Sequence, residues 1–177
     1  MLYIGIDTGT HTGLAVWDSE AKAFHVIDTM KLHEVLFYVK SLWDGRKDIR
    51  VVFEDARQRK WFDTRTAAQD RARLQGAGSV KRDCNIWEEF LKDCKIPYEA
   101  VPPCRNVTKT TAASFARLTK WKGKTSEHSR DAAMLVWNRT PIRSFLEQAI
   151  LGNKNAKREK RPYEALKDLR TGKHTRK

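Results

Sequence analysis

The sequence predicts one α/β domain, built on a mixed five-stranded sheet of three antiparallel strands and two parallel strands with flanking helices. Three short apolar runs at the start of the chain are joined by short polar or glycine-containing links, and such links favour antiparallel hairpins. The later apolar runs are separated by segments with helical periodicity, which favour parallel pairing through a crossover. A chain of 177 residues with 40% hydrophobic and 32% charged residues can bury the core of one such soluble domain.

The N-terminal half supplies a meander of three strands, a helix and a central strand. The three strands are predicted at 2–7, 13–18 and 23–28. Residues 32–43 place leucines and valines at helical spacing, and Gly45 is a suitable C-terminal stop. Residues 50–55, RVVFED, form an apolar run that ends in two acids. Because this run follows a helix, it predicts a central strand parallel to an earlier one.

The C-terminal half supplies the remaining helices and one more strand. A long helix is predicted at about 66–93, although it contains Gly76 and Gly78. An interior glycine costs a helix roughly 1 kcal/mol, so the pair predicts either close packing against a neighbouring backbone or a break between two helices. A strand stopped by paired prolines and three further helices follow, at 96–103, 107–119, 126–138 and up to Leu151.

The charge of the chain indicates its kind of partner. A net charge of +13 and a pI near 9.9 predict a polyanionic partner, with nucleic acid favoured over a membrane surface because no long basic amphipathic segment stands out. Residues 152–177 carry ten Lys/Arg and three Asp/Glu, a net of +7 that leaves +6 for residues 1–151. We therefore expect a basic domain at 1–151 and a basic tail at 152–177 that adds sequence-independent affinity for phosphates.

Cysteine usage and hydropathy indicate the compartment. The three cysteines, Cys84, Cys94 and Cys104, form no CxxC or Cys/His pattern, so free thiols in a reducing cytosol are expected and zinc is not. No apolar run approaches the roughly 20 residues that span a bilayer, and the N-terminus lacks the basic-then-apolar pattern of a signal peptide. A cytoplasmic protein without membrane contact is the expectation.

Four polar side chains stand where the predicted elements could bring them together. A meander followed by alternating helices and strands is the order of an RNase H-like fold, in which the first and fourth strands are neighbours. Asp7 and Glu54 end those two strands, while His128 and Asp131 stand three apart on one face of a predicted helix that Thr125 or Ser126 could cap. Taken singly, each acid could also simply face water, and the His/Asp pair could be an exposed helix face.

Several motifs together resemble the RuvC-type Holliday junction resolvases. They are GIDTGTHTG, VVFED, RARLQGAGSV, VPPCRNVTK and HSRDAAMLVW, in that order over roughly residues 1–140. The resemblance implies a crossover junction endodeoxyribonuclease of DNA recombination and repair. It further implies a homodimer that cuts branched double-stranded DNA with two Mg²⁺ ions in each active site, for which Mn²⁺ can substitute. A phage or mobile element could encode such an enzyme.

The resemblance also implies a role for each of the four side chains. By position, Asp7, Glu54, His128 and Asp131 match the metal-binding and catalytic set: Asp7 would bridge both ions, Glu54 would hold one, and Asp131 with His128 the other. Many members have an aspartate in place of His128, so this residue is either a ligand or a proton acceptor. Asp55 and Glu127 are adjacent acids that could serve instead.

The basic segments are the candidate DNA contacts. Basic residues neutralise phosphates, and aromatic residues stack on or wedge between unpaired bases. Tucked aromatics on a flexible loop and solvated lysines are the alternatives. Residues 87–91 and the glycine-containing helix could form the dimer interface or pack internally. The candidate DNA contacts are Arg57, Arg59, Lys60, Trp61, Phe62, Arg65, Arg105, Lys109, Lys120, Lys122 and Lys124.

Three other functions remain open from the sequence. The nearest is an RNase H-like endonuclease that acts on flaps, branches or forks, which a comparison of four-way-junction and flap substrates would separate. The motif GIDTGT also resembles the first phosphate loop of sugar kinases and Hsp70-like ATPases, but those proteins need a duplicated domain and a second glycine-rich loop, and micromolar ATP binding would revive that reading. The third is a DNA-binding protein with a degenerate nuclease fold.

Overall fold

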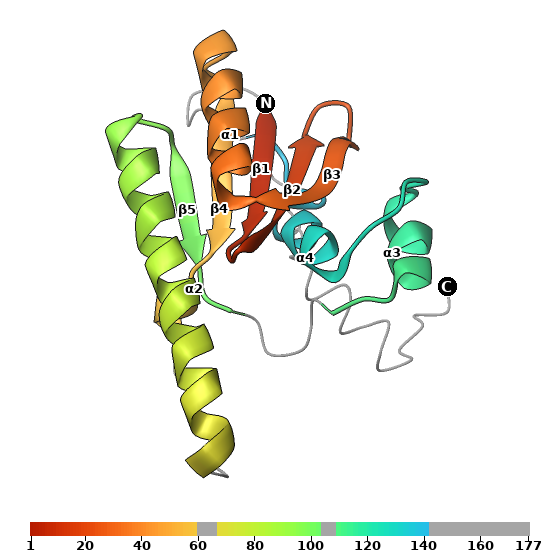
Figure 1. The fold of residues 1–177 in the computed structure, drawn as a ribbon. Helices are drawn as coiled ribbons and strands as arrows, with labels where there is room; N and C mark the ends of the chain where they lie inside the picture. The colour runs from red at the N-terminus through yellow and green to blue at the C-terminus, as the bar shows by residue number, and fades with distance from the viewer. Residues whose placement is uncertain (60–66, 104–108, 142–177) are drawn as a thin grey trace, which may run out of the picture.

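The computed structural model describes residues 1–59, 67–103 and 109–141, with the backbone alone described for 67–75 and 77. A five-stranded mixed sheet lies between two helical layers (Figure 1). In chain order the elements are β1 (Leu2–Asp7), β2 (His11–Asp18), β3 (Ala23–Lys31), α1 (Leu32–Gly45), β4 (Ile49–Glu54), the 3₁₀ turn η1 (Ala56–Gln58), α2 (Ala67–Asp93), β5 (Tyr98–Val101), α3 (Ala112–Thr119) and α4 (Glu127–Val136).

The sheet has the predicted topology. Its strand order is β3-β2-β1-β4-β5, with β2 antiparallel to both β1 and β3 and with β4 and β5 parallel to β1. The first and fourth strands are therefore neighbours, and both run in the same direction. This is the mixed α/β arrangement of an RNase H-like fold, as predicted.

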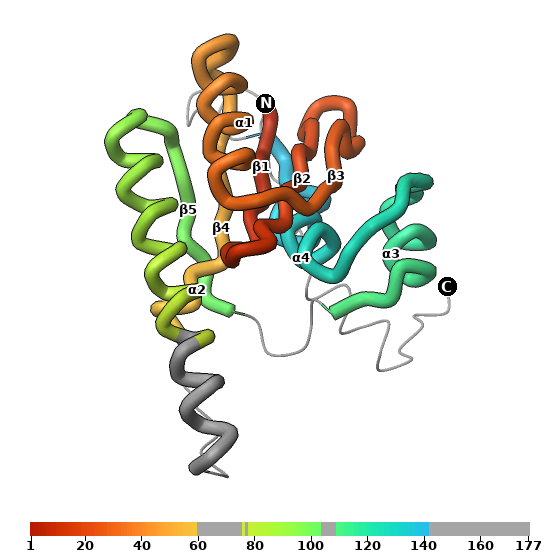
Figure 2. The backbone as a smooth tube through the Cα atoms, in the orientation of Figure 1, coloured from red at the N-terminus to blue at the C-terminus, as the bar shows by residue number. Residues whose placement is uncertain are grey.

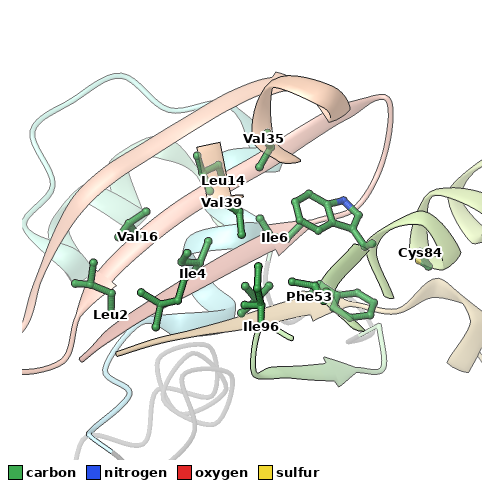
Figure 3. Close-up of a cluster of buried hydrophobic side chains, with 14 residues drawn as sticks. Leu2, Ile4, Ile6, Leu14, Val16, Val35, Val39, Phe53, Cys84 and Ile96 are labelled. Carbon is green, nitrogen blue, oxygen red and sulfur yellow. The ribbon is translucent and has the colours of Figure 1, made fainter. Parts of the chain in front are cut away.

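Alternation along the strands sends successive side chains to opposite helical layers. Even-numbered residues of β1 face α1 and α2, where they join the larger hydrophobic core drawn in Figure 3. That core also takes Phe53 from β4, Val35 from α1, and Trp87 and Leu91 from α2. Trp87 and Leu91 have no exposed surface, which confirms the alternative that this part of α2 packs internally. The labelled core residues of β1 are Leu2, Ile4 and Ile6.

The odd-numbered face of β1 carries a second, smaller core under α3 and α4. Tyr3 of β1 and Trp17 of β2 lie there with Phe115 of α3 and Val136 of α4, all of them buried. The backbone trace in Figure 2 shows α4, from late in the chain, returning beside the first two strands. The end of the sheet at which β1 and β4 stop is thereby placed next to the start of α4.

Side-chain hydrogen bonds hold both ends of α4 on the sheet. At its start, Thr29 Oγ1 of β3 and Ser126 Oγ are 2.5 Å apart. After its end, the Trp17 indole donates to the carbonyl of Arg139 at 2.9 Å, and the Tyr3 hydroxyl donates to the carbonyl of Thr140 at 2.8 Å. The helix is therefore fixed by three different strand side chains rather than by hydrophobic contact alone.

The long helix α2 differs from prediction at its two glycines. It runs without a break through Gly76 and Gly78, so the predicted alternative of two helices is wrong. A Cβ atom at either glycine would meet nothing within 4 Å, so the predicted close approach to another backbone is absent among the described residues. Burial of Trp87 and Leu91 further along the same helix offsets the cost of the two glycines.

The remaining differences concern the ends of elements. β2 begins at His11 and β3 continues to Lys31, because these two residues pair with each other and lengthen the hairpin. β5 is shorter than predicted, and α3 begins only at Ala112, where Thr111 Oγ1 accepts from the Ser114 amide at 3.2 Å. The helix predicted up to Leu151 and the predicted tail at 152–177 lie outside the described residues.

Two further expectations can be compared with the described part of the chain. None of the helices in that part is long and apolar enough to cross a membrane. Cys84 is buried and Cys94 partly buried, and both thiols are free, while Cys104 falls outside the described residues.

Candidate active site

Asp7 and Glu54 lie side by side at the ends of two parallel strands. Ile6 of β1 is the register partner of Phe53 of β4, so the next residue of each strand is Asp7 or Glu54. Both belong to the side-chain set that faces α4, because they follow Ile6 and Phe53, which face the opposite layer. Strand pairing alone therefore places two carboxylates at one edge and on one face.

Two glycines allow α4 to reach these carboxylates. A Cβ atom at Gly13 would lie 2.1 Å from the carbonyl oxygen of His128, and one at Gly5 would lie 2.1 Å from the carbonyl oxygen of Ala132. Real side chains do not approach a backbone so closely, so only glycine is compatible with this packing. The helix rests directly on the backbones of β1 and β2, with its first turn beside Asp7.

The first turn of α4 is capped as predicted for one of the two candidates. Ser126 Oγ accepts a hydrogen bond from the Ser129 amide at 3.0 Å, and the Ser126 amide donates to Ser129 Oγ at 2.9 Å. This reciprocal cap fixes the direction of the helix start. His128 and Asp131 then follow on one side of the first turns, as their spacing requires.

The structure brings Asp7 into contact with His128. The Nδ1 atom of His128 lies 2.8 Å from Oδ2 of Asp7, between residues 121 positions apart. The Asp7 side chain is 17% exposed and that of His128 is 53% exposed. The contact engages the Nδ1 nitrogen of the imidazole with this carboxylate.

The carboxyl groups of the site have raised pKa values. Burial, followed by the nearby charges of Asp7 and Asp131, raises the pKa of Glu54 to about 7. Burial and the charges of Asp7 and Glu127 raise the pKa of Asp131 to about 6. Burial also raises the pKa of Asp7, against the opposing hydrogen bond from His128. Three carboxyls that resist ionisation beside one another form a region that a cation would stabilise.

The carboxylate oxygens of Asp7, Glu54 and Asp131 suit a hard divalent cation, although these side chains do not yet converge on one point. Oδ1 of Asp131 is buried without a hydrogen-bond partner, and buried carboxylate oxygens normally have one. Carboxylate oxygens are the ligands that Mg²⁺ prefers, with waters completing its shell. Within the described ranges, however, no three His, Cys, Asp or Glu side chains are close enough to hold a metal ion as they stand.

The two adjacent acids that the sequence left as alternatives lie in other contacts. Glu127 pairs with Lys109 on the outer side of the α4 start. Asp55 is 4% exposed and turns toward α2, where its carboxylate accepts from Arg57 Nε at 2.7 Å. Strand alternation explains this difference, because consecutive residues cannot face the same side of a sheet.

Arg57 and Arg59 differ in their surroundings. The Arg57 guanidinium is held by Asp55 and by Glu88 of α2. Arg59 is exposed, and its charge partly opposes the effects of burial and of Asp7 and Asp131 that raise the pKa of Glu54.

Lys109 lies beside the site, and three lysines are exposed next to α4. The Glu127 ion pair is the main cause that raises the pKa of Lys109, and the charges of Asp131 and Asp7 add to it. Three exposed lysines, Lys120, Lys122 and Lys124, lie between α3 and α4. The other predicted DNA contacts, Lys60, Trp61, Phe62, Arg65 and Arg105, lie outside the described residues.

Sequence reasoning missed the residues that support Glu54. The Glu54 carbonyl accepts a hydrogen bond from Thr8 Oγ1 at 3.0 Å and lies 3.7 Å from the Cys84 thiol. Thr8 Oγ1 and Cys84 Sγ are themselves 3.3 Å apart. Thr8 sits next to Asp7 in the first motif, which is a local signal, whereas no pattern in the sequence connects Cys84 to this corner.

Comparison with known proteins agrees on the fold. No protein-family model matches the chain, and no curated protein matches it in sequence. Among solved structures, the chain is similar to T. thermophilus RuvC in complex with a Holliday junction substrate, at 16% identity and a TM-score of 0.55, over 78% of this chain and 92% of that one. At this identity the likeness shows a shared fold.

Proposed function

We propose that the chain is a divalent-metal-dependent endonuclease that resolves four-way DNA junctions by paired nicks. One observation carries the proposal: of two neighbouring strand-end carboxylates, Asp7 contacts His128 in the first turn of α4, and Glu54 lies near enough to Asp131 of the same helix for their charges to interact. The fold shared with a junction-bound RuvC and the excess of positive charge support the choice of substrate. A homodimer follows from the need for two symmetric cuts.

Asp7, Glu54 and Asp131 would hold the cations, and His128 would act as a further ligand or move a proton. Two divalent cations, when bound, supply an activated hydroxide and neutralise charge on the leaving oxygen of a phosphodiester. The chain itself supplies the negative charge that attracts them: three partly buried carboxyls, of which Asp131 has an oxygen without a partner. A bound cation would oppose the burial and like charges that raise the pKa values of these carboxyls, and would therefore favour their ionised form.

Exposed arginine and lysine side chains near the ends of β1 and β4 would bind the DNA. Arg59 precedes the segment at 60–66, and Lys122 and Lys124 precede α4. Each could neutralise a phosphate next to the carboxylates, while Lys109 and Lys120 extend the same basic border. Lys60, Trp61, Phe62, Arg65 and Arg105 remain proposed contacts, with the two aromatic residues as candidate wedges.

The test is cleavage of a labelled mobile four-way junction with Mg²⁺, with Mn²⁺ and with EDTA, with the nicks mapped on all four strands. We expect symmetric paired nicks with either cation and none with EDTA. Flaps and replication forks of matched sequence serve as comparison substrates. Faster cutting of a flap than of the junction would instead favour the branch-directed endonuclease, and cutting in EDTA would contradict a metal-dependent mechanism.

A further inference from the structure

Asp55, which directly follows Glu54, is a buried charge with an unusually complete set of partners. It is 4% exposed. Its Oδ1 accepts from the Arg57 amide at 3.0 Å and from Arg57 Nε at 2.7 Å, and its Oδ2 accepts from Arg57 Nη2 at 3.0 Å and from Gln58 Nε2 at 3.2 Å. Its own amide donates to the carbonyl of Val101 in β5 at 2.7 Å. A buried carboxylate is tolerated only with such partners.

Arg57 extends this contact to α2. Its Nη2 lies 2.6 Å from Oε2 of Glu88, and its Nη1 donates to Oδ1 of Asn85 at 2.7 Å. Glu88 is itself held by Lys92 at 2.9 Å and by the hydroxyl of Tyr98 at 3.1 Å. Hydrogen bonds from Lys92 and Arg57 lower the pKa of Glu88 to about 2, so this carboxylate is charged across the working pH range.

All three nitrogens of the Arg57 guanidinium are therefore engaged within the chain. A phosphate contact by arginine normally uses the same fork of N–H donors. To reach DNA, Arg57 would have to leave Asp55 as a buried charge without its main partner, which is strongly unfavourable. Arg59, two residues on, is exposed.

Asp55 follows Glu54 immediately in the chain and is paired with Arg57, so their contacts support the residue at the end of β4. On one side of the Glu54 peptide, Thr8 donates to its carbonyl. On the other side, Asp55 is tied to β5 through Val101 and to α2 through Arg57. Because a strand end without such supports frays, the direction of the Glu54 side chain depends on the Asp55 and Arg57 contacts.

We propose that Arg57 is a positioning residue: together with Glu88 it locks the Glu54–Asp55 corner onto α2, and it does not bind DNA. The part of this proposal that concerns catalysis rests on the proposed role of Glu54 at the metal site. The part that concerns the attachment of Asp55 and Arg57 to α2 is independent of that role. The variants Arg57→Gln and Glu88→Gln break the same ion pair from its two ends, and Arg46→Gln breaks the exposed Arg46–Asp48 pair at the opposite end of β4 as a matched control.

The first measurement needs neither DNA nor metal. Amide hydrogen exchange of Asp55 reports whether its bond to Val101 stays closed. We expect exchange at least tenfold faster in Arg57→Gln and in Glu88→Gln, no further increase in the double variant, and no change in Arg46→Gln. Unchanged exchange in both single variants would overturn the proposal. If Arg57→Gln does not fold, Glu88→Gln still provides the test, because it keeps the Asp55–Arg57 ion pair and loses only the pair between Arg57 and Glu88.

The second measurement separates positioning from DNA contact. Junction affinity is measured in EDTA over a range of salt concentrations, where loss of one phosphate contact reduces the magnitude of the negative slope of log K against log salt by about 0.9. We expect the slope of Arg57→Gln to equal that of the parent. A slope whose magnitude is smaller by about 0.9 would assign Arg57 to a phosphate and overturn the proposal.

The third measurement is the Mg²⁺ dependence of single-turnover cleavage at saturating junction. A misplaced Glu54 weakens cation binding, so Glu88→Gln should raise the Mg²⁺ concentration for half-maximal rate at least fivefold while the rate at saturating Mg²⁺ stays within threefold of the parent. An unchanged half-maximal concentration would overturn the catalytic part. If the parent itself does not cut, the proposed function fails, and the exchange measurement still decides the role of Arg57.

Discussion

Gly13 and His128 meet backbone to backbone: a Cβ atom on the glycine would lie 2.1 Å from the histidine carbonyl oxygen. The contact joins the second strand to the first turn of α4. It brings the His128 side chain within 2.8 Å of Asp7, the register partner of Gly13 in the sheet. The opening motif thus has two tasks, since its aspartate supplies a carboxylate and its glycine admits the helix that carries the other groups.

Substituting Gly13→Ala should separate α4 from the sheet. The neighbouring atom is a backbone oxygen that cannot rotate away, and overpacking of this kind costs about 1–3 kcal/mol or more. We expect a lower melting temperature and a loss of junction cleavage of at least tenfold. Thermal unfolding followed by circular dichroism, together with single-turnover cleavage, measures both effects.

Gly78→Ala is the matched control for that substitution. Nothing lies within 4 Å of a Cβ atom at this exposed helical glycine, so alanine should raise the stability of the protein by up to about 1 kcal/mol. Equal destabilisation by the two alanine variants would mean that the close contact at Gly13 is not what limits the site.

Substituting Asp7→Asn should abolish cutting and leave DNA binding intact. An amide keeps the size of the side chain but removes the negative charge that is proposed to help hold the cations. Junction binding in EDTA and cleavage in Mg²⁺ are the two measurements, and Asp44→Asn, at an exposed site on α1, is the control. Residual cleavage within tenfold of the parent would remove Asp7 from the metal site.

The stability of the metal-free protein should fall as pH rises from about 4.5 to about 7. The folded state holds a proton on Glu54 up to its raised pKa of about 7, whereas the unfolded chain releases it near 4.5, so the folded state binds more protons in this window and loses free energy of unfolding with rising pH. Asp131, with a pKa of about 6, acts in the same direction.

Glu54→Gln should remove the Glu54 part of this dependence. In EDTA at pH 8 we expect the variant to be more stable than the parent by on the order of 1–2 kcal/mol, with a smaller difference at pH 4.5. Chemical denaturation at both pH values measures it, with Glu89→Gln on the exposed side of α2 as control. If the parent were instead more stable than the variant at pH 8 in EDTA, ionised Glu54 would not destabilise the metal-free protein, and the expected pH dependence would be wrong.

The double substitution Lys122→Ala and Lys124→Ala should weaken junction binding mainly through charge. If each lysine neutralises one phosphate, the magnitude of the negative slope of log K against log salt decreases by about 1.8 in total. Lys47→Ala is the control, because this lysine lies over Trp43 at 4.4 Å, at the far end of β4 from Glu54. A slope unchanged in the double variant would exclude both lysines from the interface.

Sequence pattern was sufficient for the sheet because alternation and turn chemistry are local properties. It was insufficient at the ends of β2 and β3, where His11 and Lys31 extend the hairpin by pairing with each other. It was also misleading at Gly76 and Gly78, since helix propensity there is outweighed by burial of residues more than two turns away on α2. Long-range burial is what local propensity omits.

At the candidate site, too, local sequence pattern predicted some features and long-range contacts determined others. Strand ends and the spacing of His128 and Asp131 predicted which side chains could meet. The contact of Arg57 with Glu88 could not be predicted, because nothing near Arg57 in sequence identifies Glu88, and its position among other basic residues pointed instead to DNA. An arginine beside a basic segment looks the same in sequence whether its partner is a phosphate or a distant carboxylate.

The hydrogen bonds that hold both ends of α4 have a consequence for how such a molecule can change. Thr29 fixes the start of the helix, and Trp17 and Tyr3 fix the segment after it, so the sheet sets the rotational phase of α4. The chain leading into it through Lys122–Lys124 does not. A change in the length of that short connection would therefore leave the orientation of α4 on the sheet in place, and under the proposed function it would alter DNA contacts without moving Asp7, His128 and Asp131.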